Sequence, residues 1–147
     1  MSISDKLINT WLLVSFEMRK EKGDIVYPFG KDVKGMLIYT SSGNFSAQVM
    51  QNDRPLFKSG DQMKGSSEEI EASFKGVISY FGHYTFDEKE NSVLHHIEGS
   101  LFPNWKGLTM KRFTEFKDDI LELSTEPLTW GGENSIGMIV WRRSPDL

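Results

Sequence analysis

The chain has 147 residues, a net charge of −4 and no cysteine. This length predicts one domain over residues 1–147, and the absence of cysteine excludes disulfides and thiolate metal ligands. Scattered basic residues argue against a nucleic-acid partner. The N-terminus lacks a signal-peptide pattern, and no stretch approaches the ~20 apolar residues of a membrane helix. We therefore expect a cytoplasmic protein with neither a nucleic-acid nor a membrane partner.

Alternation of apolar and polar residues predicts a mostly antiparallel β-structure. The predicted strands cover residues 10–18, 34–40, 44–50, 81–87, 92–99, 108–116, 120–125 and 136–143. A helix is predicted over residues 66–80, with Ser66 or Ser67 as its cap and one apolar face, and a single helical turn over residues 5–8. In the first strand, we expect Trp11, Leu13, Ser15 and Glu17 to share one face.

The hairpin at residues 34–50 turns at Ser42-Gly43, where glycine supplies the positive φ of a tight turn. A two-residue loop there would bring Tyr39 opposite Ser46. Tyr39 and Gln48 lie on opposite faces in any regular pairing, so at least one of them points away from the interior.

Two histidines meet in the hairpin at residues 81–99. With a three-residue loop His83 faces His95, and with a four-residue loop it faces His96. Either register brings two imidazoles onto one sheet face, with Cβ atoms ~5 Å apart. The alternative is one buried histidine bonded to a barrel tyrosine and one exposed histidine.

Arg112 falls on the apolar face of the hairpin at residues 108–125, together with Leu121 and Leu123. An inward guanidinium keeps its proton and needs a partner, which could be Glu17, Glu98 or an anionic ligand.

Eight strands joined mostly by short turns, with one helix between the third and fourth, predict an all-β, eight-stranded antiparallel up-and-down barrel. An open sandwich is the alternative. Eight strands form a barrel that either fills with side chains or holds one small ligand. We expect Trp11 to stack with Arg142 or Arg143 at the closed end.

Several stretches resemble the lipocalin-like domain family of small intracellular β-barrel proteins. They are Asn9–Glu17, Gly35–Thr40, Ser46–Gln48, His95–Trp105 and Val140–Arg143. The resemblance covers nearly the whole chain and implies a lipocalin-type barrel. It also implies ligand handling, or cofactor-free isomerisation or cyclisation of secondary metabolites.

Three functions therefore stay open at this point: binding of a small, largely apolar molecule with a carboxylate or carbonyl group, a cofactor-free isomerase or cyclase, and a protein-interaction module. The catalytic candidates are His96, Glu98 and Arg112. The candidate ligand-binding residues are Tyr39, Gln48, His83, Tyr84, Asn104, Trp105 and Arg112. No cofactor and no metal are expected, although two histidines with Glu98 would suit zinc or iron. The oligomeric state stays open, a homodimer included.

Overall fold

The computed structural model describes residues 2–145. Its elements in chain order are α1 (Ile3–Leu7), β1 (Asn9–Lys20), β2 (Ile25–Val26), β3 (Val33–Tyr39), β4 (Asn44–Gln51), α2 (Ser67–Lys75), β5 (Val77–Asp87), β6 (Ser92–Ser100), the 3-10 helix η1 (Pro103–Trp105), β7 (Thr109–Lys117), β8 (Ile120–Thr125), β9 (Leu128–Trp130) and β10 (Glu133–Arg143).

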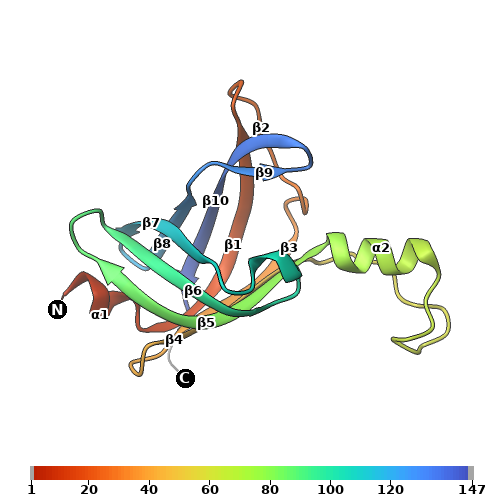
Figure 1. Ribbon diagram of the computed structural model, residues 1–147, viewed down its shortest axis with the longest axis horizontal. Coiled ribbons are helices and arrows are strands. Elements are labelled where there is room, and N and C mark those ends of the chain that lie inside the picture. The colour runs from red at the N-terminus through yellow and green to blue at the C-terminus, as the bar shows by residue number, and fades with distance from the viewer. Residues whose placement is uncertain (1, 146–147) are drawn as a thin grey trace.

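The strands form one closed antiparallel sheet (Figure 1). Neighbours follow the chain order, and β1 closes the barrel because it pairs with β3 at one edge and with β10 at the other. Without the short β2 and β9, eight strands make the barrel, and α2 lies between the third and fourth of them. This confirms the predicted fold. In the part of the chain described, no helix is long and apolar enough to cross a membrane.

A β-bulge changes which residues of β1 point inward. The pairing of β1 with β10 shifts between Leu13 and Ser15. As a result Trp11 and Phe16 are both buried, although they are five positions apart and strict alternation would separate them. The prediction that Trp11, Leu13, Ser15 and Glu17 share one face was therefore wrong beyond the bulge.

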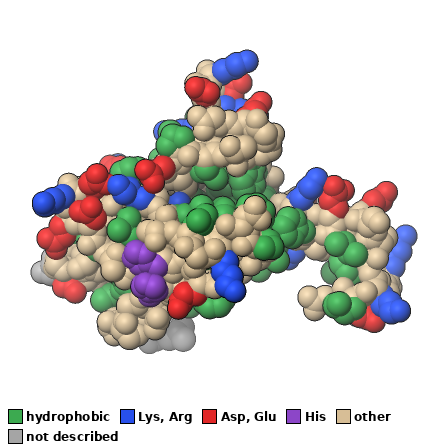
Figure 2. Space-filling model, viewed as in Figure 1, with side chains coloured by type: hydrophobic (Ala, Val, Ile, Leu, Met, Phe, Trp, Pro, Cys, Tyr) green, Lys and Arg blue, Asp and Glu red, His purple; other side chains and the backbone are tan. Residues whose placement is uncertain are grey.

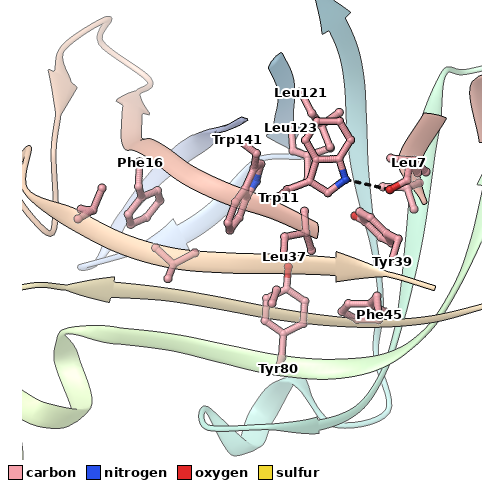
Figure 3. Close-up of a cluster of buried hydrophobic side chains, with 14 of the residues drawn as sticks. Leu7, Trp11, Phe16, Leu37, Tyr39, Phe45, Tyr80, Leu121, Leu123 and Trp141 are labelled. Carbon is pink, nitrogen blue, oxygen red and sulfur yellow. Dashed lines mark hydrogen bonds between the residues drawn. The ribbon is translucent and has the colours of Figure 1, made fainter. Parts of the chain in front are cut away.

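The N-terminal segment packs into the hydrophobic cluster of the barrel, where Leu7 lies beside Trp11 (Figure 3). Helix α1 is capped by Ser2 and buries Leu7, whose carbonyl accepts a 2.9 Å hydrogen bond from Trp11 Nε1. The Arg143 guanidinium lies 4.8 Å from the centroid of the Trp11 ring, which confirms the predicted cation–π contact.

Helix α2 ends five residues earlier than predicted, and Val77 to Tyr80 belong to β5. Gly76 ends the helix, and the β-branched Val77 and Ile78 favour the strand that follows. The helix buries no residue and projects from the barrel (Figure 1). Ile70 and Phe74 are about half exposed, so their helical spacing does not mark a core face.

Two further predictions need correction. Three residues, 41–43, connect Thr40 to Asn44, whose carbonyl accepts a 2.9 Å hydrogen bond from the Thr40 amide, so Tyr39 pairs with Phe45 and not with Ser46. Strand β9 was not among the predicted strands, and it carries Trp130 and pairs with the start of β10.

Candidate functional site

The interior of the barrel holds a small cavity with largely apolar walls. Its volume is about 40 Å³. Its polar groups come from Tyr80, His95, Arg112, Thr125 and Trp141. The apolar wall is made by Phe16, Met18, Leu37, Ala47, Val49, Ile78, Trp105, Leu123, Leu128, Trp130 and Ile139, with Gly137 beside them. Apolar walls with a few convergent polar groups are typical of a small-molecule site.

Arg112 on β7 is the one charged side chain among the residues that line this cavity. It is 7 % exposed, which confirms its predicted inward orientation. Its Nη1 donates to the backbone carbonyl of Lys111 at 3.2 Å, and its Nη2 contacts the sulfur of Met110 at 3.5 Å. Within residues 2–145 no carboxylate oxygen lies within 4.0 Å of its guanidinium, so neither Glu17 nor Glu98 is its partner. The cavity wall therefore carries a buried cation that has no counter-ion in the described part of the chain.

His95 on β6 lies between two tyrosines and is fully buried. Its Nε2 is 2.6 Å from the Tyr39 hydroxyl, and its Nδ1 is 3.2 Å from the Tyr80 hydroxyl. The ring of Phe45 stacks on the imidazole at 4.2 Å. Burial holds the pKa of His95 well below its ordinary value, and the nearby Arg112 charge lowers it further. His95 is therefore a neutral imidazole.

A neutral imidazole donates one hydrogen bond and accepts one. Hydroxyl donors make shorter hydrogen bonds than N–H donors, so we assign the 2.6 Å contact to Tyr39 donating to Nε2. The Nδ1–H of His95 then donates to the Tyr80 oxygen. This leaves the Tyr80 hydroxyl proton without an acceptor among the described residues, on the cavity wall.

Trp141 adds a third donor. It lines the cavity, and its buried Nε1 has no hydrogen-bond partner in the described part of the chain. Thr125 Oγ1 is an acceptor in the same wall, and it already accepts a 2.9 Å bond from the Gly137 amide. The cavity thus offers hydrogen-bond donors from Arg112, Tyr80 and Trp141 and no carboxylate to receive them.

A wider pocket of about 410 Å³ lies next to the inner cavity. The two share Ile78, Trp105 and Trp130, so these side chains form the boundary between them. Phe29, Leu101 and Phe102 extend the apolar wall of the wider pocket. We call this wider pocket the mouth. Figure 2 shows hydrophobic side chains gathered in a recess of the surface below the end of the barrel that carries β2 and β9.

The predicted histidine pair forms on the outer face of the barrel. The loop between β5 and β6 covers four residues, so His83 pairs with His96, and their rings stack at 4.6 Å. His96 also bonds to Thr85 and Thr109, each at 2.9 Å. Glu98 is exposed and lines no part of the cavity. The histidine side chains visible on the surface in Figure 2 are therefore those of His83 and His96, because His95 is fully buried.

Of the three catalytic candidates, Arg112 lines the cavity, whereas His96 and Glu98 lie on the outer face of the barrel. Its described residues contain no cluster of three His, Cys, Asp or Glu side chains that could share a metal ion. Of the predicted ligand-binding residues, Trp105 and Arg112 line the cavity, and Tyr39 lies behind His95.

The remaining predicted residues lie elsewhere. Gln48 faces outward and bonds to Ser46 and Ser79, while the Tyr84 hydroxyl donates to the Thr40 carbonyl. Asn104 is exposed on η1.

The sequence-based alternative of one buried histidine bonded to a barrel tyrosine is confirmed at His95. Sequence reasoning did not, however, name His95, Tyr80 or Trp141 as cavity residues. A signal for His95 was present, because it shares strand parity with Val93 and Ile97, whereas His96 shares parity with Glu98. Tyr80 was hidden by its assignment to the predicted helix.

Comparison with known proteins gives an independent view of the barrel. A model of the lipocalin-like domain matches residues 8–144. The chain is also similar to the 4'-hydroxy-3'-methoxypropiophenone carrier protein of Aspergillus oryzae, with 37% identity over 109 residues that cover 69% of this chain and 98% of that protein. The resemblance noted from the sequence motifs is confirmed, and the chain belongs to the lipocalin-like domain family.

Proposed function

We propose that this protein is a carrier that binds one small, largely apolar molecule through an oxygen acceptor inside the barrel. The observation that carries the proposal is Arg112, a buried cation on the cavity wall with no carboxylate partner among residues 2–145. Burying a charge without a partner costs several kcal/mol, so a fold retains one more readily when a ligand compensates it. The bidentate geometry of guanidinium suits a carbonyl, carboxylate or phenolate oxygen.

The sizes of the two pockets suggest which part of such a molecule lies in each of them. The inner cavity of about 40 Å³ holds a few waters or one small polar group. The mouth of about 410 Å³ has room for an aromatic ring with a short substituent. We expect the apolar body to lie against Trp105 and Trp130 while its oxygen reaches toward Arg112, with small movements of these tryptophans.

The related carrier protein supports a ligand class for the first tests. Its name gives 4'-hydroxy-3'-methoxypropiophenone, an aryl ketone with a phenolic hydroxyl, as the molecule that the relative carries. Such a compound combines a flat apolar ring with oxygen acceptors, which matches the tryptophan boundary and the donors of Arg112, Tyr80 and Trp141.

Two observations favour binding over the isomerase or cyclase alternative. Burial raises the pKa of Tyr39 well above its ordinary value and lowers that of His95, so both groups keep their protons fixed near neutral pH. His96 and Glu98, the other groups considered for proton transfer, face away from the cavity. A general acid or base needs contact with the reacting atom and a pKa near the working pH.

The test is a titration with 4'-hydroxy-3'-methoxypropiophenone, followed by tryptophan fluorescence and calorimetry. We expect saturable binding with one molecule per chain, and recovery of the ligand unchanged by mass spectrometry. Arg112→Met should weaken binding at least about tenfold, which corresponds to ~1.4 kcal/mol. Arg142→Met is the matched control, because Arg142 is exposed on β10, and it should bind like the natural chain. Absence of saturable binding, or equal binding by Arg112→Met, would contradict the proposal.

A further inference from the structure

The charge of the cavity carries an inference that deepens the proposed function and rests on it. We infer that the barrel binds a weak organic acid in its ionised form, as a monoanion whose oxygen is the counter-ion of Arg112. An ionised phenol, enol or carboxylic acid has this chemistry. A neutral molecule of the same shape would be the weaker ligand.

The first step is the charge of the wall. The residues lining the inner cavity include Arg112 and no aspartate or glutamate. The described neighbours that contact its guanidinium, the Lys111 carbonyl and the Met110 sulfur, are uncharged. An arginine cannot lose its proton to relieve its burial. The wall therefore keeps a full positive charge at every physiological pH.

The second step is the number of charges. The titratable groups that face one another here are Arg112 from β7, His95 from β6, Tyr39 from β3 and Tyr80 from β5. Burial and the Arg112 charge lower the pKa of His95, so it adds no second positive charge. Burial raises the pKa of Tyr39, so Tyr39 does not ionise to neutralise Arg112 from within. The cavity therefore carries one positive charge, which matches a monoanion.

The third step is hydrogen bonding. An oxyanion accepts two or three hydrogen bonds, and Tyr80 and Trp141 supply donors beside Arg112. A neutral phenol or carboxylic acid has an O–H proton that requires an acceptor. The two hydroxyl oxygens in the wall each already accept one hydrogen bond, Thr125 Oγ1 from the Gly137 amide and the Tyr80 oxygen from His95, and each hydroxyl also has a proton to donate. Donors therefore outnumber acceptors in the site, which favours the ionised ligand over the protonated form.

The experiment compares two probes: the hydroxyaryl ketone used for the first test, and its methyl ether, which cannot ionise. Phenolates of such ketones absorb at longer wavelength than the phenols, so the spectrum reports the bound form directly. The titration is made about one pH unit below the pKa of the free probe, where most of the free probe is neutral. The natural chain is compared with Arg112→Met, with the charge-retaining Arg112→Lys and with the exposed control Arg142→Met.

We expect the phenolate band to appear on binding to the natural chain and to Arg142→Met. It should be lost in Arg112→Met and partly retained in Arg112→Lys. The pKa of the bound probe should fall by at least about one unit, equivalent to a tenfold preference for the anion. Affinity for the phenol should therefore rise with pH up to the pKa of the free probe, whereas affinity for the methyl ether should not change.

Each other outcome is decisive. If the phenol binds but its spectrum is that of the neutral form, the inference that the ligand binds as a monoanion is wrong. Equal affinity for both probes at every pH would contradict it as well. In both cases the proposed carrier function is unaffected. If neither probe shows saturable binding to the natural chain, the proposed function fails for this ligand class and the inference fails with it. The spectrum of the natural chain alone separates these cases, even if a variant misfolds.

Discussion

His95 and His96 are adjacent in the chain and lie in opposite environments on the two faces of β6. His95 is fully buried, stacks on Phe45 and bonds to two tyrosines. His96 is half-buried on the outer face, stacks on His83 and bonds to two threonines. The difference follows from the two-residue period of a strand. We therefore expect substitutions on the inner face of the barrel to cost stability, and substitutions on the outer face to be tolerated.

The largest expected effect is the difference in stability loss between substitutions of two phenylalanines. Phe45 is buried on the inner face, and Phe81 on the neighbouring strand is 54 % exposed. Phe45→Ala should lower the free energy of unfolding by about 3–5 kcal/mol, because it opens a cavity and removes the ring stacked on His95. Phe81→Ala should cost less than about 1 kcal/mol. Chemical denaturation measures both, and equal losses would contradict the distinction between the faces.

The second contrast replaces each histidine by alanine. We expect His95→Ala to destabilise the fold by about 2–4 kcal/mol, because it leaves a cavity and removes the hydrogen-bond partner of the Tyr39 and Tyr80 hydroxyls. His96→Ala loses contacts that water can replace and should cost below about 1 kcal/mol. A larger loss from the outer substitution, measured by urea denaturation, would reverse the assignment.

The third prediction is that substitution of Arg112 has opposite effects on ligand affinity and on the stability of the fold. Without ligand, Arg112→Met should raise the free energy of unfolding by about 1 kcal/mol, because it removes a buried cation that has no carboxylate partner in residues 2–145. The same variant should bind ligand at least about tenfold more weakly. Thermal unfolding with and without ligand measures both effects. A destabilised Arg112→Met would indicate that the arginine serves the fold and not the ligand.

The smallest expected effect is on pH dependence. The pKa of His95 is held below its ordinary value in the folded chain, so the unfolded chain binds a proton that the folded chain does not. The resulting stability is fully present above about pH 6.5 and is lost as pH falls from there toward the depressed folded-state pKa. His95→Gln should remove this part of the slope. An unchanged slope between pH 7 and 5 in that variant would contradict the account.

Alternation along the strands made much of this structure predictable. The inward position of Arg112 followed from its parity with Leu121 and Leu123 across a tight hairpin, and the structure confirms it. The stacking of Trp11 with an arginine of the last strand is confirmed at Arg143. Both features could be predicted because they depend on residue alternation and on the order of the strands, which can be read from the sequence.

The remaining features depend on a bulge, on loop lengths and on contacts between distant strands, which the local sequence pattern does not predict. The bulge in β1 reverses the parity between Trp11 and Phe16 within a single strand. The loop lengths at 41–43 and 88–91 set the registers of their hairpins, and a one-residue change alters every cross-strand pair. The trio of Tyr39, His95 and Tyr80 joins three strands across the lumen, so it becomes visible only when the barrel closes.

The most direct test of the carrier function is a crystal structure of the protein with the hydroxyaryl ketone bound. The account predicts that the ligand lies between Trp105 and Trp130, with one of its oxygens within hydrogen-bond distance, about 2.7–3.2 Å, of the Arg112 guanidinium. A ligand located only on the outside of the barrel, or an inner cavity filled by side chains with Arg112 paired to a carboxylate, would contradict it.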